Sequence, residues 1–234
     1  GAKLDSIENN DTYVYLNNIP KEICKLKCKE IYWHLINKKY VTPTCIKKWQ
    51  SIYDNVIFDW EMIYTCAFRI ARETALQSFQ HKIINRYIPC RYNLYKWKKS
   101  DNDLCNYCNG KNVDTIEHFL VECPRSKEFW SKFFAWWKMI YDVNIGVNVL
   151  DIVFGIANQD QETVLNSLNF CILFGKYYIY KCKKGETTIL FEDFKHELYN
   201  RLKCESYLMQ MENNNEVFHN NWYNIMESLV QNSV

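Results

Sequence analysis

Four metal-binding side chains in one short stretch constrain this chain more than any other feature. Two residues separate Cys105 from Cys108, nine more precede His118, and another four precede Cys123. A tetrahedral Zn²⁺ site needs four thiolate or imidazole ligands, and two cysteines two residues apart on a tight turn supply a pair of them. Four protein ligands leave no coordination position open for water, so the spacing predicts a structural zinc site. The alternative is that these are ordinary buried cysteines and a histidine.

Turn and capping signals lie between the four ligands. The dipeptide Asn109-Gly110 favours a tight turn directly after the first cysteine pair. Asp114 followed by Glu117 is typical of a helix N-cap with a capping box, which places the histidine ligand on the first turn of a short helix. Pro124 is suited to the first position of the next helix. The pattern therefore predicts a turn and a short helix around one metal ion.

The composition favours a helical protein with a substantial core. Of the 234 residues, 48% are hydrophobic and 16% are aromatic, whereas only six are glycine and four are proline. So few chain-breaking residues indicate long regular elements, mostly helices. The predicted fold class is all-α, a multi-helix domain with one inserted CCHC zinc module. Its predicted parts are a helical N-terminal part with a basic surface (1–100), the zinc module (101–124) and a C-terminal helical part (125–234).

The cysteines outside the module indicate the cellular compartment. The chain has eleven cysteines, an odd number without a disulfide-like framework, which favours a reducing environment in the nucleus and cytoplasm. Cys24 and Cys28 lie four residues apart with His34 further on, and we interpret them as core thiols rather than ligands of a second metal. No run of about eighteen apolar residues occurs, so no membrane partner is expected.

Hydrophobic spacing and boundary residues predict the remaining elements. One short strand is predicted at Tyr13–Leu16 and a short apolar segment at Leu150–Gly155. Helices are predicted over Pro20–Lys38, Thr44 to Trp49, Trp60–Phe68, Thr74–Ile88, Pro124–Tyr141, Thr163–Lys184, Thr188–Met211 and Val217–Leu229. The many aromatic rings of residues 124–141 are interpreted as core rather than as a stacking platform. Three lysines near residue 184 are explained by the helix dipole alone.

Charge is distributed unevenly along the chain. Residues 69–99 contain eight Lys or Arg residues and one acidic residue, Glu73, whereas residues 205–234 contain four Glu and no Lys or Arg. A basic middle beside an acidic end suggests a surface that faces nucleic acid. The alternative is a solvated helix face followed by an acidic tail.

Basic and aromatic residues alternate just before the zinc module. On the helix predicted over Thr74–Ile88, Lys82 and Arg86 lie one turn apart, a spacing that can follow a phosphate backbone. Between residues 90 and 99, cations alternate with rings that can either stack on bases or pack in the core. The candidate nucleic-acid contacts are Arg69, Arg72, Lys82, Arg86, Arg91, Tyr92, Lys96, Trp97, Lys98 and Lys99.

The order of these features resembles a known family. The matching segments are FQHKIINR (79–86), LYK (94–96), CNYC (105–108), TIEHFLVEC (115–123) and FW (129–130), followed by IVFG (152–155) and KYYIYK (176–181). This order is similar to the cysteine-rich C-terminal region of reverse transcriptases from non-LTR (LINE-type) retrotransposons. The resemblance covers roughly residues 29–200, and the last thirty residues contribute little.

The resemblance carries expectations about ligands and partners. By matching motif, the four residues at 105, 108, 118 and 123 are the zinc ligands, whereas Gln80, Lys82 and Arg86 lie in a matching helix without assigned roles. In that family the polyprotein nicks DNA and copies its own RNA from the nicked end, and this region binds the element RNA and the target DNA. The implied partners are RNA, DNA and the rest of the polyprotein, with no small-molecule substrate.

Catalytic signatures of such polyproteins are missing from this sequence. Asp-Asp does not occur, so the polymerase signature is absent, and no proline follows Pro124, so the Pro-Asp start of a downstream nuclease is absent. We therefore expect a non-catalytic nucleic-acid-binding part of an enzyme that supports target-primed reverse transcription, or a descendant that keeps only this part. The alternative function is a protein-interaction module that docks on the polymerase core or on a host factor.

Overall fold

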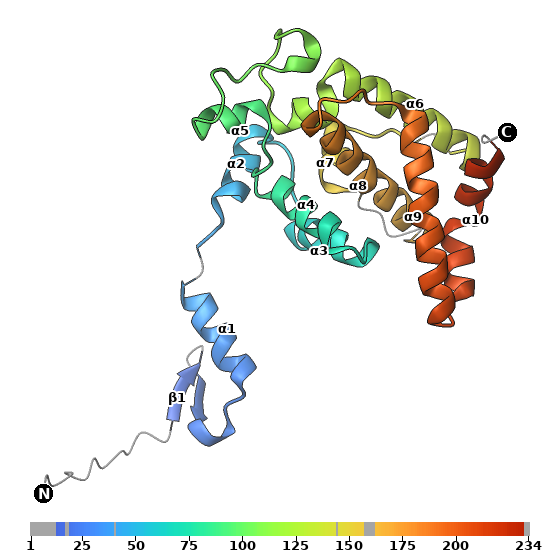
Figure 1. Cartoon of the computed structure of the whole chain (residues 1–234). Helices are drawn as coiled ribbons and strands as arrows, with labels where there is room; N and C mark the ends of the chain where they lie inside the picture. The colour runs from blue at the N-terminus through green and yellow to red at the C-terminus, as the bar shows by residue number, and fades with distance from the viewer. Residues whose placement is uncertain (1–12, 17–18, 40, 144, 157–161, 232–234) are drawn as a thin grey trace, which may run out of the picture. The chain divides into compact units, whose positions relative to one another are not determined.

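Helices make up most of the chain, as its few glycines and prolines predict, and the all-α class is confirmed. The computed structural model describes residues 13–16, 19–39, 41–143, 145–156 and 162–231 (Figure 1). By packing, the chain divides into two units, Gly1–Asp54 and Asn55–Val234, each of which is described by itself. No helix of the described residues is long and apolar enough to cross a membrane.

The first unit departs from the all-helical prediction by one small hairpin. Strand β1 (Tyr13–Leu16) lies where the sequence predicts it, and it pairs antiparallel with β2 (Ile19–Glu22). The helix predicted to begin at Pro20 is therefore wrong at its start. A short 3₁₀ turn, η1 (Ile23–Lys25), follows, and α1 begins only at residue 28 (Cys28–Lys39), before α2 (Thr44–Ile52).

The two cysteines near α1 are not core thiols. Cys24 and Cys28 are both exposed, and none of the α1 side chains is buried. The core interpretation of this pair is therefore wrong, because the segment before α1 pairs as a strand instead of continuing a helix with a buried face.

The second unit contains the remaining helices, of which those at residues 91–96 and 149–154 were not predicted. Asp59 caps α3, because its Oδ1 accepts a 2.9 Å hydrogen bond from the N–H of Met62. An Asn148–Asp151 capping box starts α7. The helices are α3 (Trp60–Ile70), α4 (Thr74–Ile84), α5 (Arg91–Lys96), α6 (Pro124–Tyr141), α7 (Val149–Phe154), α8 (Glu162–Lys184), α9 (Phe191–Met211) and α10 (Asn215–Gln231).

Helix α4 ends four residues before the predicted end at Ile88. Arg86 adopts a left-handed backbone with φ of 57°, and the N–H of Tyr87 donates to the carbonyl of Lys82 over 2.7 Å. This hydrogen-bond pattern closes many helices at their C-terminus. Arg86 therefore leaves the helix that carries Lys82, so the predicted one-turn spacing of these two cations on a single face is wrong.

Aromatic side chains of α6, α8 and α9 form the centre of the second unit. The ring of Phe129 lies 5.1 Å from that of Phe194, and Phe174 lies 5.6 Å from Phe194. Gly175 on α8 permits this packing, since a Cβ added there would meet the Trp130 ring at 3.0 Å. All four of these rings are buried, which confirms the interpretation of the α6 aromatics as core. Figure 1 shows α9 and α10 running back along one another as a helical hairpin.

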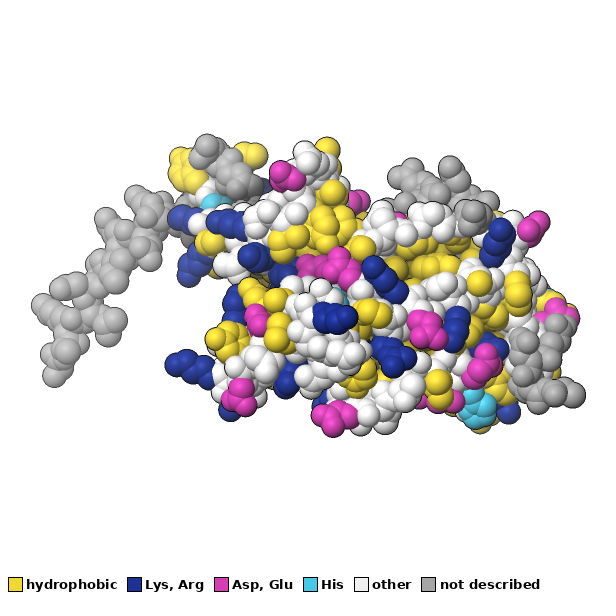
Figure 2. Space-filling model, turned by 90° about the horizontal axis from the view of Figure 1, so that it is seen from above, with side chains coloured by type: hydrophobic (Ala, Val, Ile, Leu, Met, Phe, Trp, Pro, Cys, Tyr) yellow, Lys and Arg dark blue, Asp and Glu magenta, His cyan; other side chains and the backbone are white. Residues whose placement is uncertain are grey.

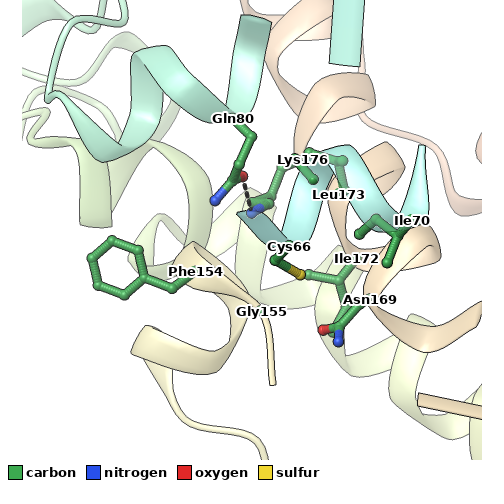
Figure 3. A pocket seen from close by; sticks show the side chains of 10 residues that line it. Cys66, Ile70, Gln80, Phe154, Gly155, Asn169, Ile172, Leu173 and Lys176 are labelled. Atoms are coloured by element: carbon green, nitrogen blue, oxygen red, sulfur yellow. Dashed lines mark hydrogen bonds between the residues drawn. The ribbon is translucent and has the colours of Figure 1, made fainter. Parts of the chain in front are cut away.

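A buried lysine joins α4, α7 and α8. Lys176 is 2% exposed, and its Nζ donates to Gln80 Oε1 over 2.6 Å and to the carbonyl of Val153 over 2.8 Å (Figure 3). Gln80 Nε2 donates to the same carbonyl over 3.0 Å. The helices on both sides of the zinc module therefore share one polar cluster inside a common core, and the role of Gln80 is to build that core.

Candidate metal centre

The first two candidate ligands lie on a hairpin closed by backbone hydrogen bonds. Leu104 and Val113 form an antiparallel bridge, and between them runs the 3₁₀ turn η2 (Asn106–Cys108). Asn109 and Gly110 both have positive φ, 57° and 68°, and the N–H of Gly110 donates to the carbonyl of residue 105 over 3.0 Å. The predicted Asn-Gly turn is confirmed, and it places the two cysteines of this hairpin near one another.

The other two candidate ligands lie on one π-helical turn. Element η3 (His118–Glu122) has five residues, and the N–H of Cys123 donates to the carbonyl of His118 over 2.9 Å. A π turn is rare and is found frequently at functional sites. Its wider spacing accommodates four residues between the imidazole and the thiol within a single turn, and Pro124 then begins α6 as predicted.

The predicted capping box before η3 is wrong. The hydroxyl of Thr115, not the carboxylate of Asp114, accepts the hydrogen bond from the N–H of His118, over 3.1 Å. Asp114 Oδ2 instead accepts from the N–H of Arg91 over 2.9 Å, and Glu117 pairs with a distant arginine. Both carboxylates are used in tertiary contacts, which local spacing does not reveal.

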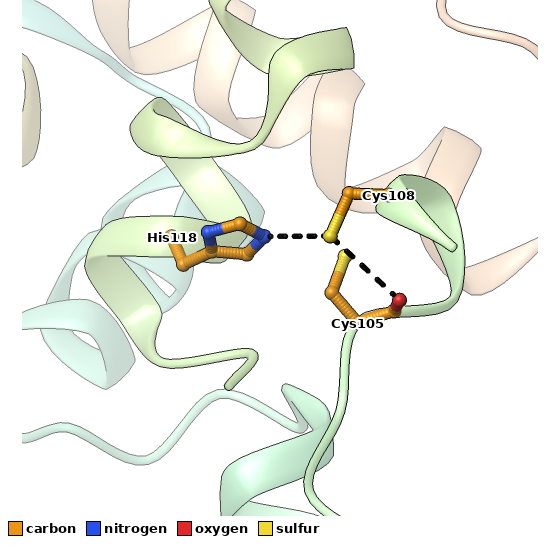
Figure 4. Close-up of side chains that lie close together, drawn as sticks. All are labelled: Cys105, Cys108 and His118. Carbon is orange, nitrogen blue, oxygen red and sulfur yellow. Dashed lines mark hydrogen bonds between the residues drawn. The ribbon is translucent and has the colours of Figure 1, made fainter. Parts of the chain in front are cut away.

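Three of the four candidate ligands form one group, and the fourth, Cys123, contacts one of them. Cys105 Sγ lies 3.9 Å from Cys123 Sγ, and Cys108 Sγ lies 3.5 Å from His118 Nε2 (Figure 4). The ligand atoms of Cys105, Cys108 and His118 all lie within 4.8 Å of one another. Three of the four residues are buried and Cys108 is partly buried.

These distances fit a tetrahedral zinc site. Zn–S bonds of about 2.3 Å and Zn–N bonds of about 2.0–2.1 Å place two thiolates about 3.8 Å apart, and a thiolate and an imidazole nitrogen about 3.6 Å apart. The observed 3.9 Å and 3.5 Å separations match these two edges of the tetrahedron. Three thiols and one imidazole are also the donor types that select Zn²⁺.

Electrostatic surroundings favour one thiolate in this centre, that of Cys123. A hydrogen bond from Cys105, together with the charge of Lys183, lowers the pKa of Cys123 to about 4. The same hydrogen bond and burial raise the pKa of Cys105, and burial raises the pKa of Asp114. Zn²⁺ with three thiolates carries one net negative charge, so a nearby buried cation compensates it.

That cation is Lys183, at the end of α8. It is 6% exposed, and its Nζ donates to the carbonyl of Phe119 in η3 over 2.7 Å. The Tyr107 hydroxyl, on the first hairpin, donates to the carbonyls of Cys182 and Lys183 over 3.2 Å and 3.3 Å. The sequence interpretation of Lys183 through the helix dipole missed this role. The sequence did contain a signal for it. Lys183 lies in an otherwise apolar helix, seven residues after Lys176 and therefore on the same helix face.

The geometry defines a Cys-Cys-His group that could hold a metal ion, with Cys123 beside Cys105. Residues 53–130 match the model of a family described as zinc-binding in reverse transcriptase. This segment contains all four candidate ligands and confirms the resemblance for this region, a third of the chain. The region is thus a zinc-binding domain of the kind associated with reverse transcriptases. A search of curated proteins found no match.

Three of the candidate nucleic-acid contacts bind protein groups. Arg72 donates to both carboxylate oxygens of Glu212, over 2.7 Å and 2.9 Å. Arg86 pairs with Glu117 at 2.6 Å, with both side chains largely buried, and Arg91 Nη2 donates to Asn106 over 2.9 Å. These arginines fasten α4, α5 and the chain after α3 to other parts of the second unit.

The other candidate contacts have more solvent access. Tyr92 is half-buried, with the ammonium of Lys96 4.5 Å from its ring centroid. Trp97 is 38% exposed, and its ring lies 4.9 Å from that of Tyr87. Five cations are exposed, and within the described ranges none of them forms an ion pair: Arg69, Lys82, Lys96, Lys98 and Lys99.

The basic side chains do not gather into one continuous patch on the face drawn in Figure 2. Lys and Arg side chains stand apart there, with acidic and hydrophobic side chains between them. The net charge of the whole chain, +2, likewise indicates no strongly basic protein.

Proposed function

We propose that this chain is a non-catalytic nucleic-acid-binding domain of a LINE-type reverse transcriptase, in which a structural zinc ion holds the binding surface together. The observation that carries the proposal is a group of exposed lysines next to the zinc module. Lys82, Lys96, Lys98 and Lys99 have no ion-pair partner among the described residues. Lys82 lies on α4, Lys96 on α5, and Lys98 and Lys99 directly after α5. Helix α5 is joined to the module by the hydrogen bond from the Arg91 N–H to Asp114.

Phosphate contacts dominate such binding, so affinity falls steeply with salt. We propose measuring fluorescence anisotropy with single-stranded and duplex RNA and DNA from about 50 to 300 mM salt, the range in which counterion release is most informative. The triple variant Lys96→Glu, Lys98→Glu, Lys99→Glu is expected to bind at least about tenfold more weakly and to lower the salt slope by roughly two. Negligible binding of the wild type at about 50 mM salt would reject the proposal.

A matched control tests whether the position of the lysines, and not only the change in net charge, weakens binding. Lys127 and Lys138 on α6 and Lys203 on α9 are exposed and lie outside the lysine group. The triple variant Lys127→Glu, Lys138→Glu, Lys203→Glu changes the net charge by the same amount. Equal weakening by both triple variants would mean that no defined surface binds nucleic acid.

The structural role of the metal has its own test. In a structural zinc site all four ligands come from protein, so loss of one is expected to unfold the module rather than to change a reaction. Cys105→Ser is expected to abolish stoichiometric zinc in elemental analysis and to lower the melting temperature. Cys204→Ser, an exposed thiol on α9, should change neither. Full retention of helicity after zinc chelation would contradict the structural role.

One observation favours the protein-interaction alternative for the first unit. Helix α1 buries none of its side chains, and Tyr32, Trp33 and Leu35 are 58%, 52% and 52% exposed. Exposed rings and apolar side chains of this kind mark interfaces. Under this alternative the chain co-elutes with the polymerase core of the same polyprotein in size-exclusion chromatography, and Tyr32→Ser with Trp33→Ser abolishes the co-elution.

A further inference from the structure

A groove in the second unit is lined by rings and lysines that lie far apart in the sequence. It has a volume of about 460 Å³ and lies between α4, the segment after α4, the end of α5 and α8. Small-molecule and nucleotide sites fall within roughly 300–1,000 Å³. The residues that carry the argument are Lys82, Tyr87, Trp97, Tyr177, Tyr180 and Lys184.

Two ring pairs form the walls of the groove. On one wall the rings of Tyr87 and Trp97 lie 4.9 Å apart, and these side chains are 62% and 38% exposed. On the other wall Tyr177 and Tyr180 lie 6.3 Å apart with nearly parallel rings, and both pack on the buried Phe79, at 5.3 Å and 5.1 Å. The rings are held by the core at their base and leave ring surface toward the groove.

The early end of α4 creates the first wall. A helix continuing to Ile88 would turn Tyr87 toward the core, as the hydrophobic spacing predicts. The left-handed backbone of Arg86 instead releases Tyr87 to the surface, where it meets Trp97. Arg86 is held at this point by Glu117 of the zinc module, so the module contributes to the shape of the groove.

Cations lie at the groove without acidic neighbours. Lys82 and Lys184 are both exposed, and no Asp or Glu lines the groove. Among the residues that the structure describes, neither lysine forms an ion pair, whereas the adjacent Lys181 pairs with Glu197 at 2.5 Å. The electrostatic character of the groove therefore suits an anionic ligand.

We propose that this groove binds one or two unpaired bases of a single-stranded nucleic acid, which stack on the ring pairs while the flanking phosphates contact Lys82 and Lys184. The inference rests on the proposed function and adds the form of the ligand. Rings exposed in a concave, cationic site match single strands, because the faces of bases in a duplex are covered by neighbouring base pairs. Only Ser78 among the lining side chains has a neutral hydroxyl or amide group away from the ring tips, so little base selectivity is expected.

The test uses the full chain with zinc and two probes. One is a single-stranded thymidine oligonucleotide carrying one central 2-aminopurine, and the other is a DNA hairpin with a fully paired stem. Binding of the single strand is expected to quench the 2-aminopurine fluorescence through stacking. Trp97→Ala and Tyr87→Ala are each expected to weaken single-strand binding roughly 5- to 100-fold and to leave hairpin binding within about twofold.

Controls identify the site within the chain. Tyr95, 51% exposed on α5, lies outside the groove lining, so Tyr95→Ala should leave single-strand affinity unchanged. Tyr180→Phe keeps the ring and should bind the single strand with wild-type affinity. Tyr180→Leu removes the ring and should bind the single strand more weakly. Unchanged melting temperatures of the Trp97 and Tyr87 variants exclude unfolding as the cause.

The outcomes distinguish the two proposals. Wild-type protein that binds both probes with a steep salt dependence, but shows no quenching or no effect of Trp97→Ala and Tyr87→Ala, overturns the groove and leaves the proposed function standing. Equal weakening of both probes by these variants also overturns it. Absence of binding to both of these probes and to the RNA probes used for the proposed function overturns both proposals.

Discussion

Buried cations are the residue-scale feature that organises this protein. Lys176 and Lys183 are 2% and 6% exposed, seven residues apart on α8. Removing an ammonium from water is costly unless it finds hydrogen-bond acceptors or opposite charge. Lys176 finds an amide oxygen and a carbonyl, and Lys183 finds a carbonyl beside the thiolates.

Replacing Lys183 should weaken zinc binding without removing a ligand. Lys183→Met keeps the length of the side chain and deletes the charge that favours the Cys123 thiolate. We expect about a tenfold loss of zinc affinity, within the 10–100-fold range typical of groups around a metal site, measured by competition with a chromophoric chelator. Lys184→Met, next along the chain and exposed, is the control. Equal affinities of the two variants would show that Lys183 is not a counter-charge.

Lys176 should make stability depend on pH. Burial lowers its pKa to about 7, whereas an unfolded lysine has a pKa of about 10.4. Between these two pKa values the unfolded chain binds more protons than the folded chain, so the unfolding free energy rises with pH. Below pH 7 the buried charge destabilises the fold by its full amount, and this destabilisation disappears as pH rises toward the unfolded pKa. Relative to Lys176→Met, the wild type should gain up to about 1.4 kcal/mol in unfolding free energy per pH unit from pH 7 to 9.

Urea unfolding of zinc-loaded protein at pH 7, 8 and 9 measures this effect. The thiols and tyrosines titrate in both proteins, so they cancel in the comparison of wild type with variant. Lys203→Met, at an exposed position on α9, should show a difference from wild type that does not change with pH. A constant difference for Lys176→Met would mean that Lys176 stays charged in the folded protein.

At the scale of elements, the zinc module acts as a joint between helices. Glu117 in its second half holds Arg86 at the end of α4, and Asp114 holds the first N–H of α5. Tyr107 in its first half binds carbonyls at the end of α8. The contacts of Asp114 and Tyr107 satisfy backbone groups at helix termini, which have no partner within the helix, whereas Glu117 pairs with the side chain of the residue that closes α4.

The Arg86–Glu117 pair should be worth more than a surface ion pair. The side chains are 14% and 9% exposed, so removing one partner leaves a buried charge and should cost about 3–5 kcal/mol. A double-mutant cycle of Arg86→Met and Glu117→Gln should give a coupling of roughly 0.5–3 kcal/mol in unfolding free energy. The exposed Lys132–Glu128 pair on α6 serves as a comparison, with an expected coupling of about 0.3–0.5 kcal/mol. Equal coupling energies for the two pairs would mean that solvent screens the Arg86–Glu117 pair as strongly as it screens the exposed pair.

At the scale of the whole molecule, the second unit is one core with the zinc module at one side. Helices before the module, α3 and α4, contact α8, which follows it. The hairpin of α9 and α10 contacts α8 and α6 but has no direct part in the metal site. The loss of structure after zinc removal should therefore differ between parts of the unit.

Hydrogen exchange before and after chelation measures this spread. Protection should be lost first in η2, η3, α5 and the start of α6, because these segments supply or directly hold the ligands. The α9–α10 hairpin should keep most of its protection, since its aromatic and aliphatic core does not depend on the metal. Uniform loss across all helices would show that the unit folds only as a whole around zinc.

Local pattern by itself determined the metal ligands and most helices of this protein. Ligand spacing, the Asn109-Gly110 turn, Pro124 and the Asp59 cap are properties of a few neighbouring residues, so their energetics do not depend on distant parts of the chain. Three of the four predicted ligands form one group and the fourth lies beside one of them, and the fold class follows from scarce glycine and proline together with helical periodicity.

Tertiary structure alone decided the roles of the charged residues. Asp114, Glu117, Arg72 and Arg86 have local patterns of caps and phosphate contacts, yet each binds a partner at least 23 residues away. The end of α4 at Arg86, the buried Lys183 and the ring-lined groove likewise join segments that only packing brings together. The physical reason is that a charged side chain takes the best partner within reach in the folded chain, and sequence distance does not limit that reach.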